Sequence, residues 1–91
     1  MKMYVIERDI PAVGGMNKTE LSGAAKTSND ALAQLNKHKP SIQWHHSYVT
    51  ADKTFCIYLA ESEHAIRDHA KISGFPATVI TEVTGVIDPT T

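Results

Sequence analysis

The sequence has a single cysteine, Cys56, and no hydrophobic run long enough to cross a membrane. A lone cysteine cannot form an internal disulfide, and a spanning helix needs about 20 consecutive apolar residues. No positively charged segment followed by an apolar stretch and a cleavage site lies near Met1. We therefore expect a cytoplasmic protein with no membrane partner.

An excess of positive charge is also absent, because nine Lys and Arg residues face ten Asp and Glu residues and the formal net charge is −1. Proteins bind nucleic acids through surplus positive charge, so the balance argues against a nucleic-acid partner. The sequence contains no CxxC, no HExxH, no phosphate-binding glycine loop and no nucleophile–base signature. These absences leave open whether the protein is an enzyme.

The chain is short, with 91 residues of which 42% are hydrophobic, and residues 1–91 are expected to form one domain. A domain of this size buries only about 60% of the surface of its unfolded chain, which leaves little reserve of stability. Burying a further face against a second copy would add to that reserve. We therefore expect a homodimer.

Segments rich in β-branched and aromatic residues predict four strands, at residues 3–8, 42–50, 54–60 and 78–87. A first helix is predicted to start at Asn17, where Glu20 completes a capping box, and to end before Pro40. A second helix is predicted to start after Ser62 and to end at Gly74. The order β-α-β-β-α-β predicts a ferredoxin-like α+β fold, with a four-stranded antiparallel sheet and both helices on one face.

The first helix carries one stripe of mostly small side chains at three- and four-residue steps, which we expect to pack closely on the sheet. The stripe consists of Leu21, Ala24, Ala25, Ser28, Leu32 and Leu35. The inward stripe expected for the second helix is Ala65, Ile66, His69, Ala70 and Ser73.

Side chains of a strand alternate between the two faces of a sheet, which divides the strand residues into two sets. The set expected beneath the helices is Val5, His45, Ser47, Val49, Phe55, Ile57, Val79, Thr81 and Val83. The set expected on the helix-free face is Tyr4, Ile6, Arg8, Trp44, His46, Tyr48, Cys56, Tyr58, Ile80 and Glu82. That second set would expose a large apolar patch, so we expect a second copy to cover it and to form a dimeric α+β barrel.

Four residues are candidate metal ligands: His46, His69, Glu7 and Cys56. Imidazole suits nickel, zinc and copper, and nickel takes further nitrogen or oxygen donors. His46 and Cys56 are expected on one face of neighbouring strands, and Glu7 is expected close to His69. His45 and His46 should point to opposite faces, so we do not expect the pair to chelate one ion. The alternatives remain open that His46 and His69 are hydrogen-bonded structural residues and that Cys56 is a small buried hydrophobe.

A second candidate site is the aromatic interior of the predicted barrel, which suits a small organic molecule. Trp44, Tyr48 and Tyr58 are expected to line this pocket. Cys56 is expected in the same lining. Glu82 is a further candidate ligand-binding residue on this face, where it is also expected to form an ion pair with Arg8. Such a pocket fits an enzyme or a carrier, and we predict no organic cofactor.

Several short strings occur together along nearly the whole chain. They are residues 4–8 (YVIER), 42–44 (IQW), 47–53 (SYVTADK), 56–58 (CIY), 67–70 (RDHA), 74–77 (GFPA) and 88–91 (DPTT). Together they resemble a family of small bacterial proteins of unknown function, related to a nickel-responsive, nickel-binding protein of streptomycetes. The resemblance implies a ferredoxin-like fold, a homodimeric α+β barrel and nickel binding, but no established reaction.

Three functional hypotheses follow. The first is a homodimer that binds nickel or another divalent metal. The alternative is a barrel enzyme or carrier that binds a small organic ligand in its pocket. The third is a structural or stress-linked dimer that binds no small ligand.

Overall fold

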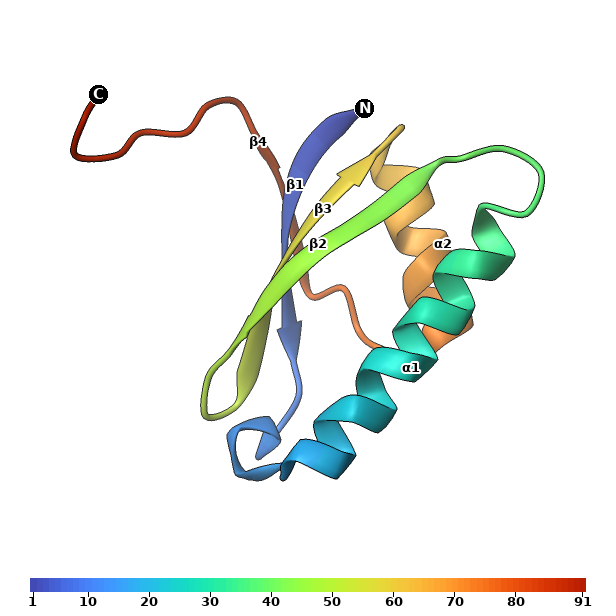
Figure 1. Ribbon diagram of the computed structural model, residues 1–91, viewed down its shortest axis with the longest axis vertical. Helices are drawn as coiled ribbons and strands as arrows, with labels where there is room; N and C mark the ends of the chain where they lie inside the picture. Colours follow the sequence, from blue (N-terminus) through green and yellow to red (C-terminus); the bar gives the residue numbers. More distant parts are fainter.

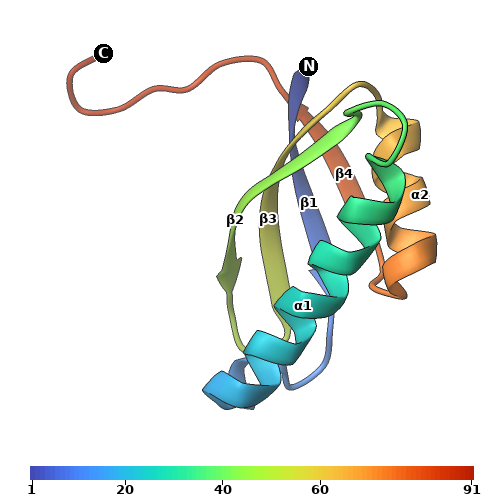
Figure 2. The same cartoon turned by 45° about the vertical axis from the view of Figure 1, so that its right-hand side comes forward.

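The computed structural model describes residues 1–91, and its elements follow the predicted order. They are β1 (Lys2–Asp9), the 3₁₀ turn η1 (Val13–Gly15), α1 (Lys18–Leu35), β2 (Ile42–Val49), β3 (Lys53–Ala60), α2 (Glu63–Ser73) and β4 (Val79–Val83). The sheet has the order β2-β3-β1-β4, and every neighbouring pair of strands is antiparallel. Both helices lie on the same side of the sheet (Figures 1 and 2). The ferredoxin-like α+β fold is therefore confirmed.

The ends of the helices are set largely by the predicted capping residues. The Asn17 side chain accepts a hydrogen bond from the backbone N–H of Glu20 at 2.9 Å, and the Glu20 carboxylate accepts one from the N–H of Asn17 at 3.1 Å. Gly74 ends α2 in the left-handed conformation, with φ of 80°, which glycine adopts without strain. Ser62 stands at the N-cap of α2 without a side-chain cap hydrogen bond.

The last strand is shorter than predicted. β4 ends at Val83, which pairs with Met3, whereas the sequence pattern continues to residue 87. β1 begins at Lys2, so residues beyond Val83 run past the end of their partner strand. The segment after β4 extends away from the body of the protein in both views (Figures 1 and 2).

No helix combines the length and apolar content that a membrane span requires.

In β1, β3 and β4 the two predicted sets of strand residues are confirmed, but the faces assigned to them were wrong. In β2 the predicted face was wrong for Trp44 and correct for residues 46–49. The set that includes Tyr4, Ile6, Cys56 and Tyr58 lies beneath the helices, and each of these side chains is at most 5% exposed. Val5 and its cross-strand partners therefore occupy the helix-free face. Strand alternation decides which residues share a face, but only the packing of the helices decides which face is covered.

A β-bulge in β2 divides the predicted aromatic set further. Trp44 pairs with Tyr58 and His46 pairs with Ile57, so His45 is an extra residue in the ladder. Trp44 therefore lies on the helix side, whereas His46 and the residue two positions later, Tyr48, lie on the helix-free side. The predicted opposition of His45 and His46 assumed a regular strand, and the bulge removes that assumption.

The helix-free face is apolar and has no cover within the chain. Its central residues, Val5, Phe55 and Ile57, are half-buried. Tyr48 is 59% exposed and Val79 is 43% exposed at the margins of this face. A contiguous apolar face of this kind marks an interaction surface in many soluble proteins.

Candidate functional site

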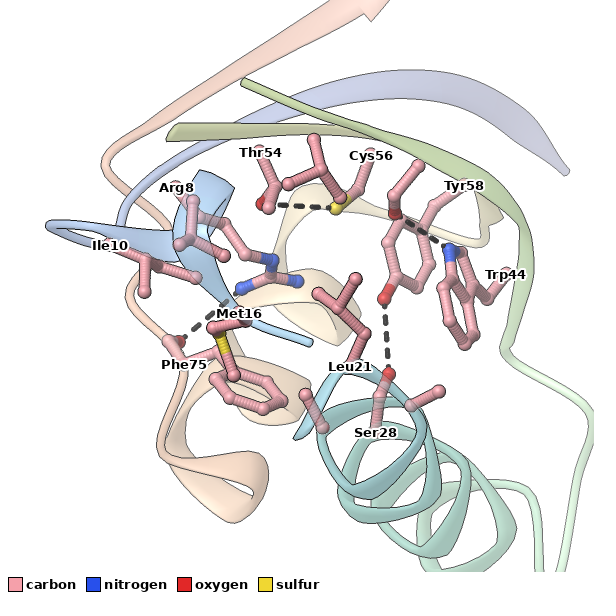
Figure 3. A pocket seen from close by; sticks show the side chains of 15 residues that line it. Arg8, Ile10, Met16, Leu21, Ser28, Trp44, Thr54, Cys56, Tyr58 and Phe75 are labelled. Atoms are coloured by element: carbon pink, nitrogen blue, oxygen red, sulfur yellow. Dashed lines mark hydrogen bonds between the residues drawn. The ribbon is translucent and has the colours of Figure 1, made fainter. Parts of the chain in front are cut away.

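A pocket of about 240 Å³ lies between the helix side of the sheet and the first half of α1. Fifteen residues line it, and 11 of them are hydrophobic. Figure 3 shows Arg8 beside Phe75 on one side of the pocket and Tyr58 beside Trp44 on the other. The pocket is therefore mostly apolar, with a few polar groups on one side.

The pocket exists because the first half of α1 carries short side chains toward the sheet. Ala24 and Ala25 both line the pocket, and neither reaches across to the strands. Farther along the helix, Leu32 is buried in the core beside Ile42, so the layers close there. The predicted close packing of the whole stripe was wrong at its N-terminal half, where alanines leave space.

The turn η1 closes one end of the pocket through a tight backbone contact. The N–H of Gly14 donates to the carbonyl oxygen of Ala51 at 3.0 Å. A Cβ atom on Gly14 would lie 2.7 Å from the carbonyl oxygen of Thr50. This approach, which only glycine permits, holds the buried Val13 against the pocket.

Arg8 is the only charged residue in the wall of the pocket. Its side chain is 3% exposed. Its Nη1 atom donates to the carbonyl oxygens of Phe75 at 3.3 Å and Pro76 at 3.0 Å, and its Nη2 atom lies 3.5 Å from Nδ1 of His69. None of the ion pairs in the protein includes Arg8.

His69 is fully buried behind this wall and bridges the two helices and the sheet. Its Nε2 atom lies 3.3 Å from the carbonyl oxygen and 3.2 Å from the hydroxyl oxygen of Ser28. Because Arg8 can only donate, Nδ1 of His69 is the acceptor and Nε2 carries the proton. Burial lowers the pKa of His69, and the positive charge of Arg8 lowers it further. The imidazole is therefore neutral at neutral pH.

Tyr58 joins the aromatic and polar parts of the wall. Its ring stacks against Trp44, with 6.4 Å between ring centroids, and the guanidinium of Arg8 lies 5.8 Å from its centroid. Its hydroxyl is 3.4 Å from the hydroxyl of Ser28. Burial raises the pKa of Tyr58, although the Ser28 hydrogen bond and the Arg8 charge act in the opposite direction. The phenol therefore stays protonated and neutral.

The four predicted metal ligands do not converge in one chain. His69 and Cys56 lie on the helix side of the sheet, whereas Glu7 and His46 lie on the other. Glu7 is 3.6 Å from Nζ of Lys53, so the predicted proximity of Glu7 to His69 was wrong. No three His, Cys, Asp or Glu side chains form a group that could hold an ion. A single chain therefore does not fit a nickel centre.

The predicted ligand-binding residues divide in the same way. Trp44 and Tyr58 do line a pocket, but it lies beneath the helices and not on the open face. Tyr48 is on the helix-free face, where its hydroxyl is 3.2 Å from Nε2 of His46. Glu82 is near the end of β4 and 3.8 Å from Nζ of Lys2, so its predicted ion pair with Arg8 was wrong.

Sequence reasoning missed the polar network behind the pocket. The sequence pattern places Ser28 only as one small residue in a stripe, and the backbone carbonyls that accept from Arg8 have no signature in the sequence. The available signal was that a polar residue, Ser28 on one helix and His69 on the other, stands within each inward stripe. Two buried polar groups on facing helices tend to bond to each other.

Topology and pocket together define a small ferredoxin-like α+β protein with an internal site between sheet and helix. Residues 4–83 match the family described as nickel responsive protein SCO4226-like. Because the match covers most of its length, the chain belongs to the SCO4226-like family.

Among solved structures, the chain is similar to the crystal structure of SCO4226 from Streptomyces coelicolor A3(2), with a TM-score of 0.73 and 15% sequence identity. The alignment covers 93% of this chain and 99% of that one. At this identity the likeness supports the fold alone. None of the curated proteins matches the chain significantly.

Proposed function

We propose that the protein binds a small organic molecule in the pocket between the sheet and α1. The observation that carries this proposal is the pocket itself, about 240 Å³ of mostly apolar space with polar groups gathered on one wall. Ligand sites in proteins have this composition, because apolar walls supply affinity and a few polar groups fix orientation. The volume lies below the range of roughly 300–1,000 Å³ usual for drug-sized ligands, so the ligand is small.

The protein contains its own reporter for such binding. Trp44 is the only tryptophan in the sequence and it lines the pocket. A ligand that enters the pocket changes the surroundings of the indole ring and hence its fluorescence. We expect phenylacetamide, a small neutral aromatic amide, to shift Trp44 emission in a saturable way at about 10 mM or below, given the weak binding of ligands of this size.

A pocket-filling variant tests whether the signal comes from this site. Ala25→Leu adds bulk at the pocket wall, and we expect it to abolish the saturable change. Ala33→Leu adds the same bulk on the exposed side of α1 and should leave binding unchanged. Binding that survives Ala25→Leu, or no binding by any neutral or charged probe of this size, would refute the proposal.

A second candidate function is divalent metal binding, with nickel first, and the family description favours it. Glu7 and His46 both lie on the helix-free face, although they do not meet within one chain. Nickel needs several nitrogen or oxygen donors, so a site here would require donors from a second copy. Metal binding on this face is thus tied to homodimerisation.

Dimerisation through the helix-free face is part of this second candidate. The face is apolar, and Tyr48 and Val79 are large exposed residues at its margins. A second copy placed there would bury the patch and bring two copies of His46 into one interface. The dimer that this implies is an α+β barrel.

Calorimetric titration of the untagged protein with Ni²⁺, Zn²⁺ and Cu²⁺ tests the second candidate. We expect saturable nickel binding tighter than about 100 μM, lost in His46→Ala and retained in His69→Ala. Loss in His69→Ala alone would move the site to the helix side. No saturable binding by the wild type would end the metal hypothesis and leave the pocket proposal standing.

A further inference from the structure

Arg8 is a buried cation without a counter-ion. Its side chain is 3% exposed, and it forms no ion pair with any Asp or Glu. Its polar partners are two carbonyl oxygens and the neutral ring of His69. The guanidinium cannot lose its proton in a protein, so a full positive charge remains in the pocket wall.

The surroundings of Arg8 balance only part of this charge. The two carbonyl groups belong to Phe75 and Pro76, just beyond the C-terminal end of α2. Each carbonyl oxygen carries only a partial negative charge, so two of them do not neutralise a full positive charge. The Tyr58 ring adds a weaker cation–π attraction. Buried charges in proteins are normally paired, so part of the Arg8 charge is left for an anion from outside.

The remainder of the pocket limits what this anion can be. No other charged side chain lines it, and most of the remaining lining is apolar, including Leu21, Met16 and Phe75. A ligand that pairs with the charge of Arg8 and also covers the apolar lining has one anionic end and one apolar body. A free inorganic anion would leave the apolar wall without a partner.

We propose that the ligand of this pocket is a small monocarboxylic acid, whose carboxylate pairs with Arg8 and whose apolar body lies against Leu21, Trp44 and Phe75. This inference rests on the proposed small-molecule function of the pocket and names its ligand class. The planar fork of an arginine matches the two oxygens of a carboxylate. A single cation in an apolar pocket calls for a single negative charge.

The charge balance favours a monocarboxylate over a phosphate monoester. A phosphate carries close to two negative charges at neutral pH, and the neutral His69 supplies no second cation. One charge of the phosphate would therefore remain unpaired against apolar side chains, which is unfavourable. Phosphate esters should bind more weakly than carboxylates of the same body.

His69 acts as a positioning residue in this arrangement. Its Nδ1 atom accepts from Nη2 of Arg8, while its Nε2–H group is anchored on Ser28 in α1. Ser28 also reaches Tyr58, so three linked side chains, those of His69, Ser28 and Tyr58, surround and hold the guanidinium. A prepositioned guanidinium loses little freedom when a carboxylate arrives.

Three probes of nearly the same shape test the inference on the wild-type protein. Phenylacetate is a monoanion, phenylacetamide is neutral and phenethylamine is a cation. With Trp44 fluorescence as the readout and ionic strength held constant, we expect phenylacetate to bind at least tenfold more tightly than the amide. The amine should bind least, and benzyl phosphate should bind more weakly than phenylacetate.

Two arginine variants locate the effect. Arg8→Gln should abolish the preference for phenylacetate over phenylacetamide, while Arg67→Gln, at an exposed arginine on α2, should preserve it. Far-ultraviolet circular dichroism checks that Arg8→Gln is folded. If that variant does not fold, Ala25→Leu serves instead, and it should remove phenylacetate binding.

The failures of this inference and of the pocket function are distinguishable. If phenylacetate and phenylacetamide bind equally and Ala25→Leu blocks both, the proposal of a carboxylate ligand is wrong, whereas the proposed binding function of the pocket is retained. Phenylacetate binding that is unchanged in the Ala25→Leu variant also overturns the inference, because the acid then binds outside the pocket. Absence of binding by all four probes overturns both proposals.

Discussion

The Nη2 atom of Arg8 lies 3.5 Å from Nδ1 of His69, so a guanidinium points at an imidazole inside the protein. This contact is compatible only with a neutral imidazole, since a protonated ring would place two cations together. The same contact assigns the proton of the ring to Nε2, which faces Ser28. The charge state of His69 in α2 is therefore coupled to Arg8 in β1.

The neutral state of His69 predicts that stability depends on pH. Burial and Arg8 lower the pKa of His69 in the folded state from its ordinary 6.5, so below about pH 6.5 the unfolded chain binds the extra proton. The stabilising contribution is complete above that pH and is lost as the pH falls through the folded-state pKa. Urea unfolding between about pH 7.5 and pH 5 should record this loss.

Two histidine variants separate this effect from other titrations. His69→Gln should flatten the pH dependence of the unfolding free energy in that window. His64→Gln, at a side chain that is 83% exposed, should leave the dependence as in the wild type. An unchanged slope in His69→Gln would contradict a neutral buried imidazole.

Removal of the Ser28 hydroxyl should destabilise the protein. The hydroxyl is within hydrogen-bond distance of both Tyr58 and His69, and Ser28→Ala leaves the buried phenol without that partner. We expect a loss of about 1–3 kcal/mol in unfolding free energy. Ser22→Ala is the matched control, because Ser22 is on the exposed side of α1. Both substitutions raise the helix propensity of α1 by the same exchange of serine for alanine. Equal stability of the two variants would contradict the network.

The two glycines of η1 should respond differently to the same substitution. A Cβ on Gly14 would meet the carbonyl oxygen of Thr50 at 2.7 Å, whereas a Cβ on Gly15 would meet nothing within 4 Å. We expect Gly14→Ala to lower the melting temperature, with a cost of about 2 kcal/mol. Gly15→Ala should be neutral or slightly stabilising. Similar melting temperatures for both variants would contradict a tight contact between η1 and the turn that joins β2 and β3.

The proposed dimer predicts that a charge placed on the helix-free face strongly weakens association. Thr81 is exposed on β4 and pairs with Val5 at the centre of that face. Thr81→Asp should convert the dimer to a monomer in sedimentation at tens of micromolar, with little change in the fold, because the residue is exposed in the single chain. Thr19→Asp, exposed at the start of α1, should remain dimeric. A monomeric wild type would overturn the proposed barrel.

The fold could be predicted from local features of the sequence. The capping box of Asn17 and Glu20, the stop at Gly74 and the alternation of the strands act over a few residues and were confirmed. The bulge at His45 could not be predicted, because a single extra residue in a ladder leaves no pattern of its own. It separates Trp44 from His46, and with them the two candidate sites.

The sequence by itself determined the order of the elements, the two residue sets of β1, β3 and β4, and the inward stripes of the helices. Only the tertiary structure decided which face the helices cover, and hence that Arg8 is buried in a pocket beneath α1 while His46 is exposed on the opposite face. The physical reason is that periodicity is a local property of the chain. Burial and charge pairing, by contrast, depend on contacts between residues far apart in sequence, such as the 61 positions between Arg8 and His69.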